Sequence, residues 1–240
     1  IWSMNNKIEI LQIGLDSHLG GIETYLLKIA TYLNTDKYSF SFLAYKGTKP
    51  CFQDQLEKLG YKFYFITSRN VCYATYIKEL NTLLSTKHFD IIHCNMNSMS
   101  NFEPILLCTK KRMNVLVHFR NGSNVGSLKT RILDYIGKRL IPYKKVTCAA
   151  VSDLAGEWMF KNKDFTVLNN GLDVEKYKYN PKVREKIRSE LEIGSREMIL
   201  HIGAFRRQKN HIQLIDIFNA YHLKHPDSIL VLVGEGELKQ

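Results

Sequence analysis

The chain has no apolar run long enough to cross a lipid bilayer. Its longest runs, such as Ile229–Val233, fall far short of the roughly 20 residues that a membrane-spanning helix needs. The first residues, Ile1–Lys7, also lack the apolar core of a signal peptide. With 45% hydrophobic and 24% charged residues, we expect a soluble globular protein of the cytoplasm.

Paired cysteines and metal-ligand spacings are missing as well. The five cysteines are scattered along the chain, and none forms a C-x-x-C pair. We find no His-x-x-x-His or Asp-x-Asp pattern, no P-loop and no readable nucleophile triad. A disulfide scaffold is therefore excluded, and we predict neither a metal nor a cofactor.

Acidic residues are scarce relative to basic ones. The 34 Lys and Arg against 23 Asp and Glu give a net charge of +11, which favours an anionic partner. Nucleic acid is disfavoured because aromatic residues do not interleave with the basic ones. A membrane surface and a phosphorylated ligand are the remaining candidates.

The basic charge is concentrated in residues 128–145, which hold six basic residues and one acid. Leu128, Ile132, Ile136 and Leu140 form one face of a predicted helix in this segment. A basic amphipathic helix can lie on an anionic membrane surface. The same stripe can instead face the protein core, with the basic face in water, and the sequence leaves both readings open.

Short apolar strands alternate with amphipathic helical stretches through most of the chain. Continuous apolar strands separated by helices indicate a parallel sheet that is covered on both faces. We therefore predict a doubly wound α/β domain, Rossmann-like, over residues 4–170. The predicted strands are Ile8–Ile13, Phe40–Ala44, Lys62–Ile66, Ile91–Cys94, Val115–Phe119, Val146–Val151 and Thr166–Leu168.

A turn-rich break follows this domain. Residues 171–196 are predicted to be a linker with a polar helix, and residues 197–240 to start a second, incomplete domain. One strand–helix–strand unit is too small to bury a core of its own. We expect it to pack on the first domain, to belong to a longer protein, or to pair with another copy through the strand edge after Val233.

Two glycines mark the first strand-to-helix loop. Gly20 and Gly21 would let backbone N–H groups at a helix start approach an anion. The loop is not G-x-G-x-x-G, which argues against a dinucleotide site. The alternative is a tight turn that requires a positive φ.

Polar residues also follow the later strands. His118, Arg120 and Asn121 come at the end of one strand, and His93 and Asn95 end another, at the sheet edge where ligands bind. Packing or capping is the alternative role for each histidine.

The segment near the chain end combines cations with glycines. Arg206, Arg207 and Lys209 follow a buried strand, and three cations suit a diphosphate. Gly234 and Gly236 follow the next strand and would admit a nucleoside close to the backbone. A solvated basic turn and a strand-ending turn are the alternatives.

Taken in order, these motifs resemble the family 4 glycosyltransferases of capsular and exopolysaccharide synthesis, which have the two-domain GT-B fold. The resemblance covers essentially the whole chain. The segments that carry it are Gly20–Thr24, Phe89–His93, Val117–His118, Ala149–Asp153, Trp158–Phe160, Leu168–Asp173, Gln208–His211 and Leu232–Glu237.

The resemblance implies retaining transfer of a sugar from a nucleotide-diphosphate sugar, usually a UDP-sugar, to a saccharide or lipid-linked acceptor. The implied donor-binding residues are Gly20, Gly21, Arg206, Lys209, Gly234 and Gly236. His118 matches the family histidine that faces the donor sugar, and Arg120, Asn121 and Asn95 are acceptor-side candidates. An acceptor on a lipid carrier would place the protein at the inner face of the membrane.

The sequence departs from the family pattern in three places. Ala204 stands where the family has arginine, and Arg120 stands where relatives have histidine. The family's Glu-x7-Glu donor motif is not among these 240 residues, so we expect them to be inactive by themselves. The competing interpretation is a non-catalytic binding module that keeps the same fold.

Overall fold

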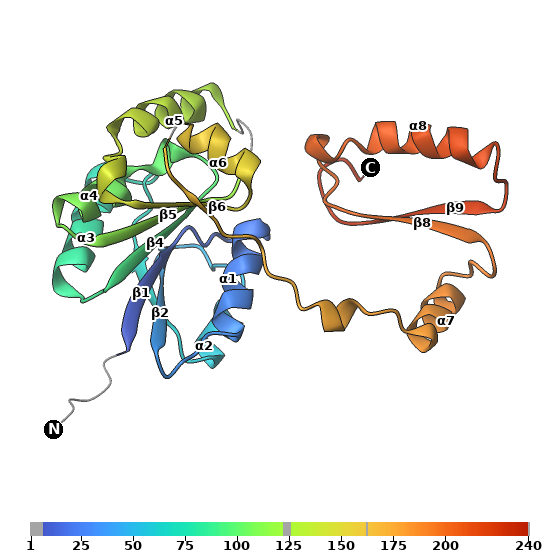
Figure 1. Cartoon of the computed structure of the whole chain (residues 1–240), viewed down its shortest axis with the longest axis horizontal. Helices are drawn as coiled ribbons and strands as arrows, with labels where there is room; N and C mark the ends of the chain where they lie inside the picture. The colour runs from blue at the N-terminus through green and yellow to red at the C-terminus, as the bar shows by residue number, and fades with distance from the viewer. Residues whose placement is uncertain (1–6, 122–125, 162, 240) are drawn as a thin grey trace. The chain divides into compact units, whose positions relative to one another are not determined.

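The computed structural model describes residues 7–121, 126–161 and 163–239 of the chain (Figure 1). Met4, the predicted start of the first domain, lies outside these residues. The chain divides into two compact units, the first ending at Leu172 and the second starting at Asp173. Residues 173–196, which the sequence assigned to a linker, belong to the second unit.

The first unit alternates strands with helices, as the apolar pattern predicted. Single-turn 3-10 helices at Met99–Asn101 (η1) and Tyr143–Lys145 (η2) interrupt this alternation. The strands are β1 (Ile8–Ile13), β2 (Tyr38–Tyr45), β3 (Lys62–Ile66), β4 (Ile91–Met96), β5 (Asn114–Phe119), β6 (Thr147–Ala150) and β7 (Thr166–Val167). The helices are α1 (Gly21–Thr31), α2 (Gln53–Lys58), α3 (Tyr73–Thr86), α4 (Glu103–Lys110), α5 (Leu128–Leu140) and α6 (Asp153–Phe160).

All seven strands of this unit form one parallel sheet in the order β3-β2-β1-β4-β5-β6-β7. The predicted doubly wound fold is confirmed. The strand order reverses between β1 and β4, which are neighbours in the sheet although β2 and β3 separate them in the chain. Ligands of such sheets bind beyond the carboxyl ends of the strands at this reversal.

Apolar side chains cover the sheet on both faces. On one face, α1 and α2 pack with Leu26 and Leu56 against Phe42. On the other face, helices α3, α4 and α6 pack against Ile92, Val117 and their neighbours (Figure 1). The two cores explain why the central strands are continuous apolar runs.

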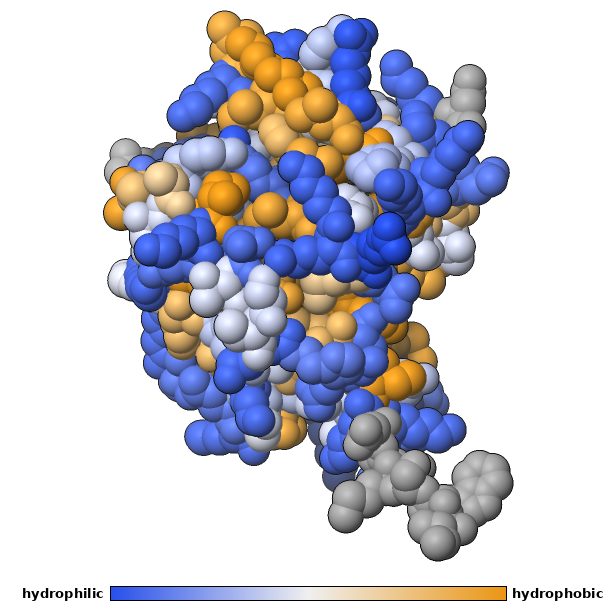
Figure 2. Space-filling view, turned by 90° about the vertical axis from the view of Figure 1, so that its left-hand side faces the viewer, coloured by the Kyte–Doolittle hydropathy of each residue, from blue (hydrophilic) through white to orange (hydrophobic). Residues whose placement is uncertain are grey.

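One helix departs from this pattern. Apolar side chains gather on the surface at the top of the first unit, where α5 lies (Figure 2). All four side chains of the predicted stripe are exposed: Leu128, Ile132, Ile136 and Leu140. The reading of this stripe as core-facing is therefore wrong.

The second unit holds one polar helix and one strand–helix–strand unit. Its elements are the 3-10 helix η3 (Val174–Tyr177), α7 (Pro181–Glu190), β8 (Glu197–Ile202), the 3-10 helix η4 (Arg207–Lys209), α8 (His211–His222) and β9 (Ser228–Val233). Strands β8 and β9 pair in parallel as a two-stranded sheet. Ile193 is the only fully buried hydrophobic side chain among the residues described for this unit. This agrees with the expectation that the stretch is too small to build a core.

Candidate functional site

A row of polar side chains crosses the centre of the first unit's sheet on the face that α1 covers. Gln12 of β1 is opposite His93 of β4, and Asn95 of β4 is opposite His118 of β5. Because side chains alternate along a strand, these four lie on one face. Each is less than a tenth exposed. The row ends at the carboxyl edge of the sheet, beside the reversal in strand order.

The two histidines of this row lie in contact. The imidazole rings of His93 and His118 stack at 5.5 Å with an interplanar angle of 6°, and His93 Nε2 lies 3.3 Å from His118 Nδ1. Tyr25 of α1 meets the His118 ring edge-on at 5.4 Å. Burial, reinforced by the charge of Arg120, lowers the pKa of His118 to about 4. For His93, burial is the main cause and repulsion by His118 and Arg120 adds to it, and together they lower its pKa to about 3. Both rings are therefore neutral at pH 7.

Arg120 covers His118 on the side of the sheet edge. Its guanidinium carbon lies 3.8 Å from the centroid of the Tyr25 ring, and its Nη1 lies 3.4 Å from both His118 ring nitrogens. Its Nη2 donates a hydrogen bond to Asn170 Oδ1. Burial lowers the pKa of Arg120, but a guanidinium stays charged in proteins. The predicted residues His118 and Arg120 are thus in contact, and Arg120 lies between the His118 ring and the solvent at the sheet edge.

His118 itself has no exposed surface. A ligand reaches its ring only if Arg120 or Tyr25 moves, whereas Arg120 is partly exposed. Asn121 follows Arg120 and is half-buried at the end of a described segment.

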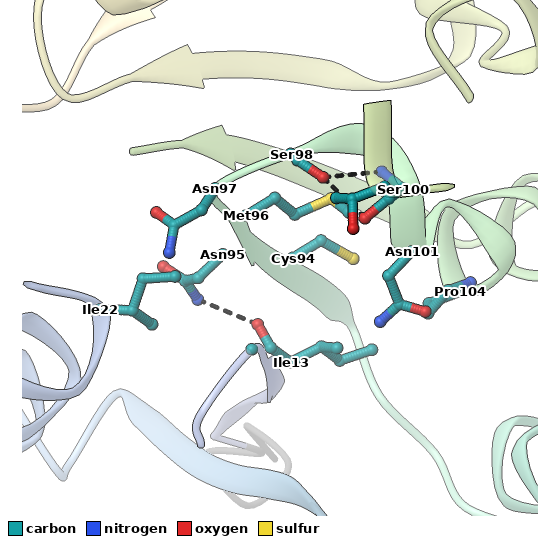
Figure 3. Close-up of a pocket in the computed structure, with 12 residues that line it drawn as sticks. Ile13, Ile22, Cys94, Asn95, Met96, Asn97, Ser98, Ser100, Asn101 and Pro104 are labelled. Carbon is teal, nitrogen blue, oxygen red and sulfur yellow. Dashed lines mark hydrogen bonds between the residues drawn. The ribbon is translucent and has the colours of Figure 1, made fainter. Parts of the chain in front are cut away.

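A cavity of about 300 Å³ opens beside this row, between the carboxyl ends of β1 and β4 (Figure 3). Asn95 anchors one wall, because its Nδ2 donates to Gln12 Oε1 at 3.1 Å and to the Ile13 carbonyl at 3.4 Å. Within the described residues, Asn95 Oδ1 is buried without a hydrogen-bond partner. The lining residues among those described are all uncharged: Ile13, Gly14, Ile22, Cys94, Asn95, Met96, Asn97, Ser98, Ser100, Asn101, Pro104 and Thr130.

The polar groups of this cavity come largely from the segment after β4. Asn97 and Asn101 extend from opposite sides in Figure 3. Ser98 Oγ accepts from the Ser100 backbone N–H at 3.1 Å and donates to the Ser100 hydroxyl at 2.7 Å. Neutral amides and hydroxyls recognise hydroxyl-rich, uncharged ligands, and they give a phosphate no counter-charge.

Glycine shapes the edge of the cavity at one position. Gly14 has a φ of +118°, and a Cβ there would collide with the Asn95 carbonyl, so no other residue fits.

The glycine pair at the start of α1 has a different conformation. Gly20 has an extended φ of −155° and Gly21 begins α1, so the alternative that this pair requires a positive φ is wrong. Space in front of Gly21 is open. The Glu23 carboxylate lies beside Gly20 and accepts from the Asp16 N–H at 3.2 Å, so an anion at this helix start would have Glu23 as its neighbour.

The second unit carries its own candidate site in the loop between β8 and α8. Arg206, Arg207 and Lys209 are exposed there. Across the described parts of the chain, no carboxylate lies within salt-bridge distance of these three cations. Asn210 ends the loop in the left-handed region, with φ 46°, and α8 begins with no side-chain cap. The loop therefore presents free cationic groups next to the uncapped N–H groups of a helix start.

The two predicted glycines after β9 have a packing role. A Cβ on Gly234 would collide with the Gly203 carbonyl, and Gly236 has a φ of +155°. The Phe205 N–H donates to the Glu235 carbonyl at 3.0 Å, which ties this loop to the one after β8. Both glycines thus hold the cationic loop close to the loop after β9.

Two histidines, of which His211 is buried, support the same loop. His211, the first residue of α8, stacks on Phe205 at 4.4 Å and meets His201 edge-on at 5.1 Å. In the described part of the chain, neither ring nitrogen of His211 has a hydrogen-bond partner. Phe205 thus joins the loop to the helix that follows it.

Sequence reasoning missed several of these neighbours. Tyr25, Glu23 and Gln12 were not singled out, although they surround the predicted His118 and Gly20. One signal was available: Gln12, His93 and Asn95 are polar residues inside otherwise apolar strands. The contact of Tyr25 with His118 had no signal, because 93 residues separate the two.

Comparisons with known proteins establish the fold. No known protein-family profile matches the sequence, and no curated protein matches it. Similar solved structures include the Alr3699/HepE protein of Anabaena in complex with UDP and glucose, with 19% identity and a TM-score of 0.70 over 95% of this chain. Another is a putative UDP-N-acetylglucosamine 2-epimerase of Listeria monocytogenes, with 15% identity and a TM-score of 0.56 over 95% of this chain.

A third is the UDP-GlcNAc 2-epimerase of Neisseria meningitidis bound to UDP-GlcNAc, with 13% identity and a TM-score of 0.53 over 93% of this chain. At these identities the likeness defines a class, the doubly wound α/β proteins. The matches cover 61%, 62% and 64% of the three neighbours, so this chain spans about three fifths of their length.

Proposed function

We propose that the chain is part of a glycosyltransferase that moves a sugar from a UDP-sugar to a saccharide or lipid-linked acceptor in the synthesis of a bacterial cell-surface polysaccharide. The sequence resemblance supports a retaining reaction, a hexose as the sugar, and a location at the cytoplasmic side of the membrane. The fold supports the donor class, since similar structures hold UDP, UDP-glucose or UDP-GlcNAc. The proposal includes no bound metal.

The observation that carries the proposal is the loop of three exposed cations between β8 and α8. A nucleotide-sugar diphosphate carries two negative charges, and several of its oxygens accept hydrogen bonds. Lys209 and Arg206 would donate to these oxygens, and the free N–H groups at the start of α8 would add to the attraction.

The same cations would assist the transfer step. When the bond between the sugar and the diphosphate breaks, the leaving UDP gains negative charge. Cations that are already in place stabilise this charge more than they stabilise the bound donor, and this difference lowers the barrier. Arg206 and Arg207 would supply the positive charge that is missing at Ala204.

The first unit would hold the acceptor. Its cavity beside β1 and β4 is lined by amide and hydroxyl groups, which suits an uncharged sugar ring. Asn95 Oδ1 would accept a hydrogen bond from a sugar hydroxyl. Arg120 and Asn121 lie at the next strand end, and we assign them to the same acceptor side.

His118 would act close to the donor sugar once Arg120 shifts. Its neutral ring has one nitrogen that donates a hydrogen bond and one that accepts at pH 7. In the conformation described, its role is to position Arg120.

The donor proposal is tested by calorimetry of this chain with UDP, GDP, UMP and uridine. Replacing Lys209 with alanine removes one charged donor to a phosphate, which is worth about 1.5–3 kcal/mol, or about a 10- to 100-fold loss of UDP affinity. Uridine lacks phosphate, so its binding is expected to stay unchanged.

Lys224→Ala is the matched control, because Lys224 is an exposed lysine of the same unit outside the loop. UDP binding that is equal in both variants would refute the role of the loop. If wild-type chain binds neither UDP nor GDP at millimolar concentration, the non-catalytic module is favoured.

A further inference from the structure

Helix α5 packs on the rest of the first unit through its polar and small residues rather than through its apolar stripe. Asp134 is buried and accepts a hydrogen bond from the Met99 N–H at 2.6 Å. Gly137 is buried against the Met99 carbonyl, and a Cβ there would lie 2.8 Å from the Phe102 ring. Lys138 pairs with Asp134 at 3.0 Å and lies over the Trp158 ring at 3.5 Å. These contacts fix the rotation of the helix about its axis.

The opposite face of α5 is therefore both apolar and exposed. Leu128 is 71% exposed and Ile132 is 52% exposed, and their exposed neighbours on this face are Tyr135, Ile136 and Leu140. Apolar side chains gather over α5 at the top of Figure 2. Contiguous apolar patches of this kind mark interaction sites on soluble domains.

Basic side chains are interspersed with the apolar ones. Lys129, Arg131 and Arg139 are exposed on α5, and Lys144 and Lys145 follow in η2. Arg139 lies on the same face as the apolar residues, with its guanidinium carbon 4.2 Å from the centroid of the Tyr135 ring. The one acid of the segment, Asp134, is buried in its pair with Lys138. Over its described residues, the outer surface of α5 and η2 carries positive charge alone.

This combination selects among the possible partners. A second copy of the chain would bring like charges together at close range. Nucleic acid would use the cations but leave the apolar side chains in water. A lipid surface takes up both, because the apolar face enters the acyl boundary while lysine and arginine reach the anionic headgroups.

We propose that α5 and η2 form a docking surface for an anionic lipid bilayer, with α5 lying in the plane of the interface. The apolar side chains supply depth, and the basic ones supply preference for anionic headgroups. No helix in the described ranges is long and apolar enough to span a membrane, and interfacial docking requires none. The proposal does not depend on sugar transfer.

The experiment is co-sedimentation of the whole chain with two kinds of vesicle. One kind is phosphatidylcholine alone, and the other contains equal parts of phosphatidylcholine and phosphatidylglycerol. We expect binding to the second kind only, and we expect it to weaken as salt is added.

Two double variants test the two components separately. Ile132→Ser/Ile136→Ser removes apolar side chains, and Arg131→Glu/Arg139→Glu reverses charge. Each basic side chain near such a surface contributes about a fivefold increase in affinity, so reversing two of them is expected to lower binding tenfold or more. The isoleucine variant loses apolar area that would enter the acyl boundary, and a loss of about tenfold or more is expected for it as well. Lys138 is left intact because it holds α5 in place.

The matched control is Val183→Ser/Ile187→Ser on α7, which removes two exposed apolar side chains from a helix that also bears acids. It is expected to bind like the wild type. Because all substituted residues are exposed, circular dichroism spectra and melting temperatures should be unchanged.

Three results would overturn the proposal: no binding of wild-type chain to anionic vesicles at low salt, equal binding by the α5 variants, or an equal loss in the α7 control. Dimerisation that depends on Ile132 and Ile136, without vesicle binding, would assign the same face to a second copy instead.

Discussion

At the scale of single residues, burial determines how His93 and His118 respond to acid. Water is excluded from both rings, and Arg120 adds a positive charge beside them. A proton on either ring would therefore be poorly solvated and repelled. The neutral state that this enforces leaves one ring nitrogen able to accept a hydrogen bond.

The lowered pKa of His118 makes a prediction about stability and pH. In the folded chain the pKa is about 4 and the ordinary value is 6.5, so the unfolded chain takes up the proton first as the pH falls. The stabilising contribution of the neutral ring is complete above pH 6.5 and is lost as the pH falls towards 4. The loss is on the order of 3 kcal/mol.

This is measured by urea unfolding at pH 7 and pH 4.5 for wild type, His118→Gln and His88→Gln. We expect the His118 variant to lose less stability between the two pH values than the wild type does. His88 is an exposed control, with its side chain 79% exposed. An identical pH dependence in all three proteins would contradict the prediction.

At the scale of elements, the packing of α5 depends on a residue without a side chain. Gly137 lets the helix approach η1 closely enough for Asp134 to reach the Met99 N–H. The apolar face of the helix stays exposed, so its packing on the first unit depends on a few specific polar contacts and on the small size of Gly137. One added methyl group at this position is enough to disrupt the contact between α5 and η1.

We predict that Gly137→Ala destabilises the first unit by about 1–3 kcal/mol, because the added methyl would collide with the Met99 carbonyl and the Phe102 ring. The measurement is the free energy of unfolding in urea. Gly21→Ala is the matched control at another helical glycine, where no atom lies within 4 Å of the added Cβ. If both variants are equally stable, the close approach of α5 to η1 is not as described.

At the scale of the whole molecule, the two units differ in how much apolar surface they bury. The first unit has two cores, whereas Ile193 is the single hydrophobic residue of the second unit that is fully buried within the described chain. Leu200 of β8 and Val233 of β9 are each about half exposed, with 47% of their surface accessible. Burial of apolar area is the main source of folding free energy, so the units should differ in local stability.

Hydrogen exchange followed by mass spectrometry tests this difference in the intact chain. Amides of β1 and β4 are expected to exchange at least a hundredfold more slowly than those of β8 and β9. Equal protection would mean that the apolar faces of β8 and β9 are covered by another part of the chain or by a second copy.

Much of the fold was predictable, because its signal is local. β1 and β3 have the predicted bounds, and the other strands of the first unit differ from prediction by at most two residues at either end. A sheet that helices cover on both faces needs continuous apolar runs in its strands and helical spacing of apolar residues between them, and both patterns can be read from the sequence. The candidate site was partly predictable for the same reason: His118 and Asn95 lie near the carboxyl ends of strands and Arg120 directly follows one, and parallel strands bring their carboxyl ends to one edge.

The sequence by itself therefore determined the doubly wound fold, the location of polar residues at strand ends, and the presence of a basic amphipathic helix. Only the tertiary structure decided that Arg120 and Tyr25 cover His118, that Gly14 is fitted to the Asn95 carbonyl, and that the apolar stripe of α5 faces outward. Periodicity shows that a helix has an apolar face, but contacts between distant residues determine where that face points. For α5 those contacts are made by Asp134 and Gly137 with Met99, more than 30 residues away in the chain.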